Sequence, residues 1–155
     1  MAERAIFGPP AAQPLEGGTF LSVHVVSVHE GRLVAFDVTA PEAEGRWLPW
    51  AILDHGGNPY EAASALIDDW CHGSTMTDLR LVDVISRARP GPAWELALVF
   101  RAELARTPGG DTRRQPHICA EGDYEGLSGF GAVEIERWLA GDEPVQREAG
   151  SPLVF

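Results

Sequence analysis

The sequence of 155 residues contains no lysine, and all 12 of its basic residues are arginine. Because 23 acidic residues oppose them, the formal net charge is -11, and we expect no nonspecific binding to nucleic acid. Only two cysteines are present, and their spacing fits neither a disulfide framework nor a zinc motif. No apolar run approaches the roughly 18–20 residues that a membrane helix needs, so we expect no membrane partner.

The N-terminal stretch MAERAIFGPPAAQP lacks the apolar segment of a signal peptide, and we therefore expect a cytoplasmic protein. Proline and glycine punctuate residues 1–18, which are predicted to form an N-terminal arm. Residues 19–143 suit one domain with a full core. Residues 144–155, which end in the apolar SPLVF, are predicted to be a C-terminal tail.

Several segments alternate in polarity or are rich in β-branched residues, and these are predicted to be strands. A hairpin is expected over 20–38 with its turn at 29–31, followed by strands near 46–50, over 78–87, over 94–104 and near 117–120. Residues 105–116 are polar and are predicted to be a loop.

Two helices are predicted between these strands. Asn58 is a good N-cap, Pro59 suits the first helical position, and an apolar face follows at helical spacing. Residues 131–140 are amphipathic, and Gly141 ends them. The order of elements predicts an α+β protein, an α/β/α sandwich with a mixed sheet and a C-terminal helix.

The segment 47–70, WLPWAILDHGGNPYEAASALIDDW, resembles the Nudix box, G-x5-E-x7-R-E-U-x-E-E-x-G-U, in which U is aliphatic. Trp47, Leu48 and Pro49 match the strand end that usually precedes this box, and Ile67 falls on an aliphatic position. The order of elements over about 20–140 also resembles the Nudix superfamily. This resemblance implies a Nudix-like fold and, in an active member, Mg²⁺-dependent cleavage of a nucleoside diphosphate linked to another moiety.

The segment keeps the skeleton of the box but lacks most of the residues that carry its chemistry. We count the box from Ala51. Gly57 then occupies its first Glu position, and Ala65 and Leu66 occupy its Arg-Glu pair. Asp69 and Trp70 occupy its Glu-Glu pair, and His72 occupies the closing Gly position. Mg²⁺ takes oxygen ligands, mostly carboxylates and water. Leu66 and Trp70 offer none, and Asp69 is one methylene shorter than glutamate.

A rearranged metal site would use Glu61, Asp68 and Asp69 on the first helix. Further carboxylates for it would come from Glu95, Glu121, Asp123 or Glu125. The alternative is that the helix carboxylates form the solvated side of an amphipathic helix.

Two aromatic residues and one arginine pair are candidates for ligand contacts. Trp50 and Tyr60 flank the loop where the family's ligand lies and could stack on a planar group, or they could pack in the core or a dimer interface. Arg113 and Arg114 could hold a phosphate, or lie in a solvated loop.

These residues support three hypotheses. The leading one is a Nudix-fold protein with an eroded metal site, no catalytic residue and no cofactor. It would act as a binding or interaction module, form a homodimer and take a nucleotide-like small molecule at most. The second is a Nudix-type pyrophosphohydrolase that acts on an ADP-ribose-like substrate with Mg²⁺ held by Asp69, Asp68 and Glu61. The third is an unrelated α+β subunit of a complex.

Overall fold

The computed structural model describes residues 19–39, 45–88, 94–124 and 127–141. The predicted arm 1–18 and tail 144–155 lie outside the described residues. The first described elements are β1 (Thr19–His29) and β2 (Arg32–Val38), which form the predicted antiparallel hairpin. Glu30 and Gly31 turn the chain between them with φ of 51° and 76°, and glycine adopts that conformation without steric cost.

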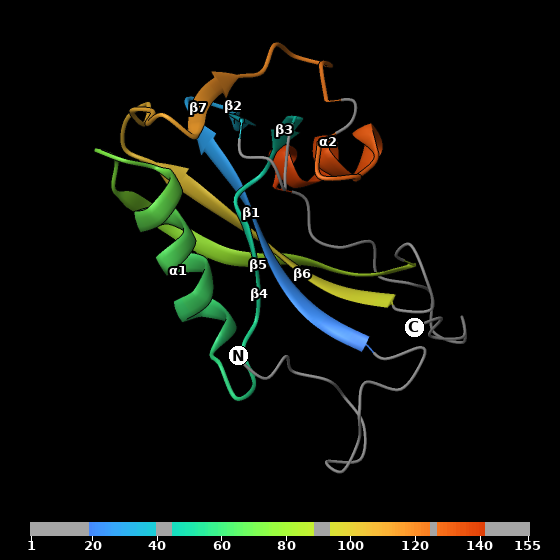
Figure 1. Ribbon diagram of the computed structural model, residues 1–155. Coiled ribbons are helices and arrows are strands. Elements are labelled where there is room, and N and C mark those ends of the chain that lie inside the picture. The colour runs from blue at the N-terminus through green and yellow to red at the C-terminus, as the bar shows by residue number, and fades with distance from the viewer. Residues whose placement is uncertain (1–18, 40–44, 89–93, 125–126, 142–155) are drawn as a thin grey trace.

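The strands form one mixed sheet (Figure 1). The remaining strands are β3 (Gly45–Trp47), β4 (Trp50–Ile52), β5 (Met76–Ala88), β6 (Trp94–Leu104) and β7 (Arg114–Ile118). The order is β3-β2-β1-β6-β5, while β4 pairs with the first half of β1 and β7 pairs with β2. β1 and β6 run parallel over ten residue pairs, and the other pairings are antiparallel.

The two helices, α1 (Pro59–Trp70) and α2 (Ala132–Ala140), pack on opposite faces of the sheet. Side chains alternate along β1, so that Val23 and Val25 join the core beneath α1 while Val26 and Val28 join the core beneath α2. The predicted α/β/α sandwich with a mixed sheet is therefore confirmed. None of the helices in the described ranges is long and apolar enough to cross a membrane.

The start of α1 follows the capping signal in the sequence. The Asn58 side-chain oxygen accepts hydrogen bonds from the backbone N–H groups of Tyr60 at 2.9 Å and Glu61 at 3.4 Å. These bonds satisfy two of the N–H groups that a helix start leaves without partners. Gly141 ends α2 in the left-handed conformation, as predicted.

Two strand boundaries differ from the predictions. The strand expected near 46–50 is split into β3 and β4, because Pro49 has no N–H to donate to a ladder and uses only its carbonyl, which accepts from Val25 N. β7 begins at Arg114, inside the segment predicted as a loop. The polar residues at its start show no strand pattern. The strand forms because its backbone pairs with β2 from Val34 to Val38.

Candidate binding groove beside helix α1

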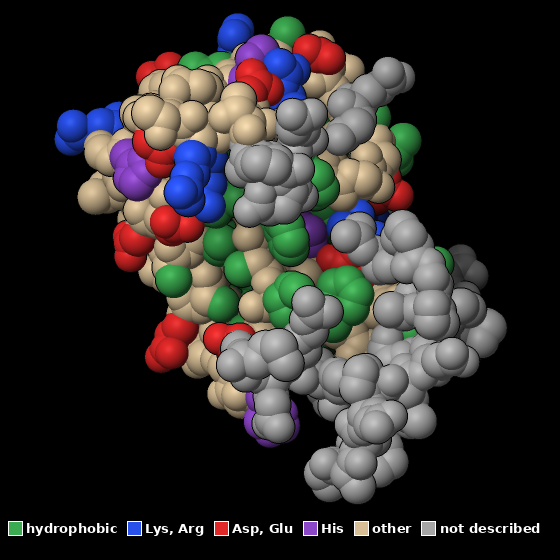
Figure 2. All heavy atoms as spheres, in the orientation of Figure 1, with side chains coloured by type: hydrophobic (Ala, Val, Ile, Leu, Met, Phe, Trp, Pro, Cys, Tyr) green, Lys and Arg blue, Asp and Glu red, His purple; other side chains and the backbone are tan. Residues whose placement is uncertain are grey.

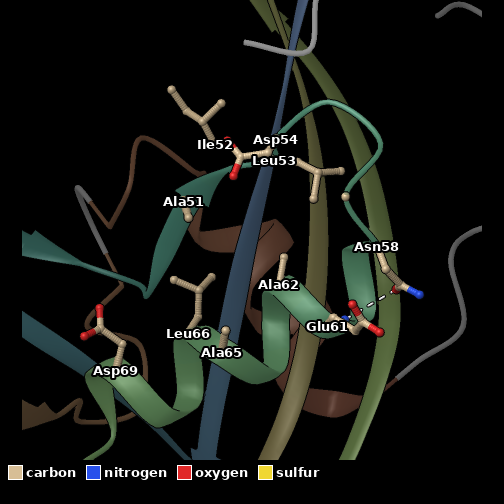
Figure 3. A pocket seen from close by; sticks show the side chains of 11 residues that line it. Ala51, Ile52, Leu53, Asp54, Asn58, Glu61, Ala62, Ala65, Leu66 and Asp69 are labelled. Carbon is tan, nitrogen blue, oxygen red and sulfur yellow. Dashed lines mark hydrogen bonds between the residues drawn. The ribbon is translucent and has the colours of Figure 1, made fainter. Parts of the chain in front are cut away.

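A groove of about 460 Å³ lies between α1, β4 and the loop that joins them (Figure 3). It is lined by Ala51, Ile52, Leu53, Asp54, Gly57, Asn58, Glu61, Ala62, Ala65, Leu66 and Asp69. Ala62 and Leu66 point from α1 toward the facing segment that carries Ala51 and Leu53. The groove thus has an apolar floor, and its volume lies within the range of small-ligand sites.

The groove's carboxylates stand at its rim, where Asp54, Glu61 and Asp69 are exposed. Glu61 and Asp69 are eight residues apart on α1, which corresponds to about 12 Å along the helix axis. Two ligands of one Mg²⁺ ion lie within about 4 Å of each other, because each sits about 2.1 Å from the metal. Asp68 is exposed on the same helix and does not line the groove.

The carboxylates present do not fit a family-type Mg²⁺ site. Leu66 and Asp69, three residues apart, share the groove side of α1, so an apolar side chain stands one turn from the Asp69 carboxylate. Within the described part of the chain, no three His, Cys, Asp or Glu side chains cluster closely enough to hold a metal ion.

An arginine lies where a cation would meet the Asp69 carboxylate. Arg114, the first residue of β7, donates from Nη1 to Oδ2 of Asp69 at 2.9 Å and to the Asp69 carbonyl at 3.4 Å. Its guanidinium also stacks 4.1 Å from the centre of the Trp70 ring. Because α1 has no basic residue in its last turn, Arg114 also supplies the positive charge that favours a helix C-terminus.

The other candidate carboxylates lie away from this groove. Glu95 shares a face of β6 with Ala97 and Val99, which belong to the core beneath α2, so the sheet separates it from α1. Glu121 and the exposed Asp123 precede α2, and Glu121 lines a second depression together with Glu136 of that helix. Glu125 lies outside the described residues.

Glu95 belongs to a buried polar cluster that the sequence did not reveal. Its carboxylate accepts from the Ser22 hydroxyl, lies 3.0 Å from Nε2 of His24, and accepts from Nε of Arg87 at 2.7 Å. Ser22, His24 and Glu95 are at most 2% exposed. Burial raises the pKa of Glu95, but the hydrogen bonds from His24, Arg87 and Ser22 outweigh it, and the pKa falls well below its usual range.

Among the described residues, the contacts of the buried polar cluster do not have the geometry of a nucleophilic triad. A serine nucleophile needs one ring nitrogen of histidine, while the acid holds the other nitrogen. Here Ser22 Oγ at 2.9 Å and the Glu95 carboxylate at 3.0 Å both meet the same Nε2 of His24. The cluster therefore binds strands together. Arg87 extends it to the turn before α2 by donating to the Ser128 carbonyl at 2.8 Å.

The two aromatic candidates contact different parts of the molecule. Trp50 stacks near His24, with ring centres 6.5 Å apart, and lies 5.9 Å from Trp47. Tyr60 is half exposed and packs edge-on against Phe100 at 4.9 Å, in the core beneath α1. Neither ring lines the groove beside α1.

Solved structures with a similar fold include Nudix hydrolases. A MutT NUDIX hydrolase from Burkholderia pseudomallei superposes with a TM-score of 0.62 at 19% identity, over 76% of this chain and 96% of that one. A NUDIX hydrolase from Nitrosomonas europaea gives 0.61 at 15% identity over 86% and 99% of the two chains. An ADP compounds hydrolase gives 0.55 at 18% identity over 79% and 74%.

The sequence itself matches no family model, and no curated protein matches it. At identities this low, the structural likeness establishes the fold and leaves the activity open. The chain has a Nudix-like fold, in agreement with the resemblance seen in its sequence.

Proposed function

We propose that this protein is a Nudix-fold binding or interaction module that does not hydrolyse nucleotides. The observation that supports this proposal is the pairing of Asp69 with Arg114, 2.9 Å apart, beside a groove whose floor is apolar. A hydrolase of this fold would need carboxylates there to hold Mg²⁺ against a pyrophosphate. The guanidinium of Arg114, in contact with Asp69, already neutralises the negative charge of the Asp69 carboxylate.

A second candidate is a hydrolase of a nucleoside diphosphate linked to another moiety. One of the similar structures is an ADP compounds hydrolase, and this likeness is the observation that favours it. Its metal would be held by Asp69, Asp68 and Glu61. The spacing of Glu61 and Asp69 on α1 argues against a shared ion.

Titration calorimetry with Mg²⁺ and Mn²⁺, with and without ADP-ribose, tests the choice between these candidates. We expect no metal-dependent heat and no product by chromatography after incubation with ADP-ribose. Arg114→Ala sharpens the test, because it frees Asp69 for a metal, while Asp69→Asn removes the carboxylate. Metal binding that rises in the first variant and disappears in the second, together with turnover, would establish the hydrolase instead.

We also propose that the protein forms a homodimer away from the groove. Leu81 and Val84 are exposed on β5, which lies at one end of the strand order β3-β2-β1-β6-β5. Ile118 is exposed on β7. Light scattering after size exclusion measures the mass directly. A monomer at high micromolar concentration would refute the dimer and leave the proposal for the groove untouched.

A further inference from the structure

We propose that the groove beside α1 receives a segment of a partner protein that presents an arginine or lysine next to an aliphatic side chain. This inference rests on the proposed non-catalytic function and names the chemistry of the partner. The proposed occupant is a cationic peptide segment. A nucleotide, in contrast, would bring negative charge into the groove.

The floor of the groove offers apolar surface to an aliphatic side chain. Leu53 and Leu66 are almost fully buried, Ala51 and Ala62 are half-buried, and Ala65 is exposed along the edge. Small side chains on both walls leave room for a side chain to lie between α1 and β4 (Figure 3). Burying apolar surface there is favourable.

The rim of the groove is acidic and favours a cation. Asp54 and Glu61 line it from its two walls, and among the described residues no basic side chain lines it. Arg114 compensates only Asp69, on the last turn of α1. Figure 2 shows acidic side chains around the exposed surface of this side of the molecule, between which hydrophobic side chains are visible.

The start of α1 does not offer the anion site that a helix N-terminus often provides. The N–H groups of Tyr60 and Glu61 already donate to the Asn58 side chain. Glu61 adds a carboxylate to the same first turn. A phosphate would therefore meet negative charge and occupied donors.

Charge also argues against a second copy of the chain as the occupant. A second copy carries the same formal charge of -11 and no lysine, so it would bring negative charge against the acidic rim of this groove, whereas the residues proposed for the dimer on β5 and β7 are apolar. A basic partner is attracted by the same field. The groove thus favours a different protein with a cationic segment.

The test is a ¹H–¹⁵N NMR titration of the full chain with three probes. The first is a capped pentapeptide that alternates leucine and arginine, the second replaces each arginine by uncharged citrulline, and the third is butyl phosphate. We expect the arginine peptide to shift amides of residues 51–54 and 61–69, with roughly fivefold weaker binding for citrulline and no groove shifts with phosphate.

Three variants locate the contact. Ala65→Trp fills the groove at an exposed position and should abolish the shifts, and Glu61→Gln should weaken binding about two- to fivefold. Asp68→Asn makes a matched charge change seven residues further along the same helix and outside the groove, and it should leave the affinity unchanged. Equal effects of Glu61→Gln and Asp68→Asn would show that only net charge matters and would overturn the inference.

Other outcomes also overturn it. Tighter binding of butyl phosphate than of the arginine peptide would mean an anion site, and no groove shift with the peptide would leave the groove without this occupant. Loss of self-association in Ala65→Trp would make a second copy the occupant. If calorimetry shows no metal binding and the arginine peptide gives no groove shifts, only this inference is refuted. Metal-dependent turnover would instead refute the proposed function.

Discussion

Nε2 of His24 lies 3.0 Å from the carboxylate of Glu95, although the two residues are 71 positions apart and both are almost fully buried. This contact joins the first described strand, β1, to β6 and, through Arg87, to the end of β5. A buried charge is tolerated only when its partners remain in place, since desolvation of an unpaired ion costs several kcal/mol. The contact between His24 and Glu95 should therefore have a large effect on the free energy of unfolding.

Replacing Glu95 with glutamine should destabilise the protein by about 3–5 kcal/mol, because Arg87 then loses its buried counter-charge. Urea denaturation followed by tryptophan fluorescence measures the change. The control is Glu103→Gln on the same strand, where the carboxylate is 36% exposed and pairs with Arg101 at 2.7 Å. We expect less than about 1 kcal/mol there. Similar losses in both variants would mean that burial of Glu95 is not the cause.

Stability should fall in acid because of the same carboxylate. The pKa of Glu95 is lowered in the folded state, where the hydrogen bonds from its partners outweigh the effect of burial, below an unfolded value of about 4.3. Its contribution is thus complete well above that unfolded value and is lost as the pH falls through it toward the lower folded pKa. Denaturation curves at pH 7, 5, 4 and 3 should show the Glu95→Gln deficit shrinking steadily in acid. A deficit independent of pH would exclude this linkage.

Arg114→Ala should cost about 1 kcal/mol, since it removes an exposed ion pair with Asp69 and the stacking on Trp70. Arg113→Ala, at the exposed neighbouring position, is the matched control and should be close to neutral. A double-mutant cycle with Asp69→Asn isolates the pair. Strict additivity in that cycle would show that the two side chains do not interact in solution.

Asn58→Ala should cost about 1 kcal/mol, because the first N–H groups of α1 lose their acceptor. Asn58→Asp keeps an acceptor oxygen at the same position, and we expect it to retain the wild-type stability. Thermal unfolding monitored by circular dichroism distinguishes the two. If the alanine variant melts with the wild type, solvent replaces the cap at no cost.

Both cysteines should resist alkylation in the native state. Cys71 and Cys119 are about 1% exposed, and burial raises the pKa of the Cys71 thiol to about 11 and that of Cys119 above its usual value. Because the thiolate is the reactive form, labelling at pH 8 should require opening of the structure. Mass spectrometry after timed iodoacetamide treatment measures each site, and rapid native labelling of either would contradict its burial.

The sequence predicted the elements whose polarity alternates or whose ends are marked. β6 matches its predicted range, and Asn58 and Gly141 mark the start of α1 and the end of α2. The strand expected near 117–120 begins earlier, at Arg114, because strand character there comes from pairing with β2 and not from the polar residues themselves. Local patterns cannot show such long-range pairing.

The site was predicted less completely than the fold. The motif located α1 and its groove, but the contact of Arg114 with Asp69 spans 45 positions and depends on where β7 begins. The buried polar cluster left one signal that sequence reasoning could have used: Ser22 and His24 alternate with the apolar Val23 and Val25 in β1. Polar residues at inward positions of an otherwise apolar strand indicate buried partners.

The parallel pairing of β1 with β6 also determines how the chain must fold. Their ten residue pairs begin with Thr19 and Trp94, so the segment between the two strands has to close a long loop before the central strands meet. Contacts between residues so distant in sequence slow folding, and the hairpin β1–β2 forms without waiting for them. During synthesis, β1 therefore leaves the ribosome long before its central neighbour, and its apolar edge stays open to other chains until β6 arrives.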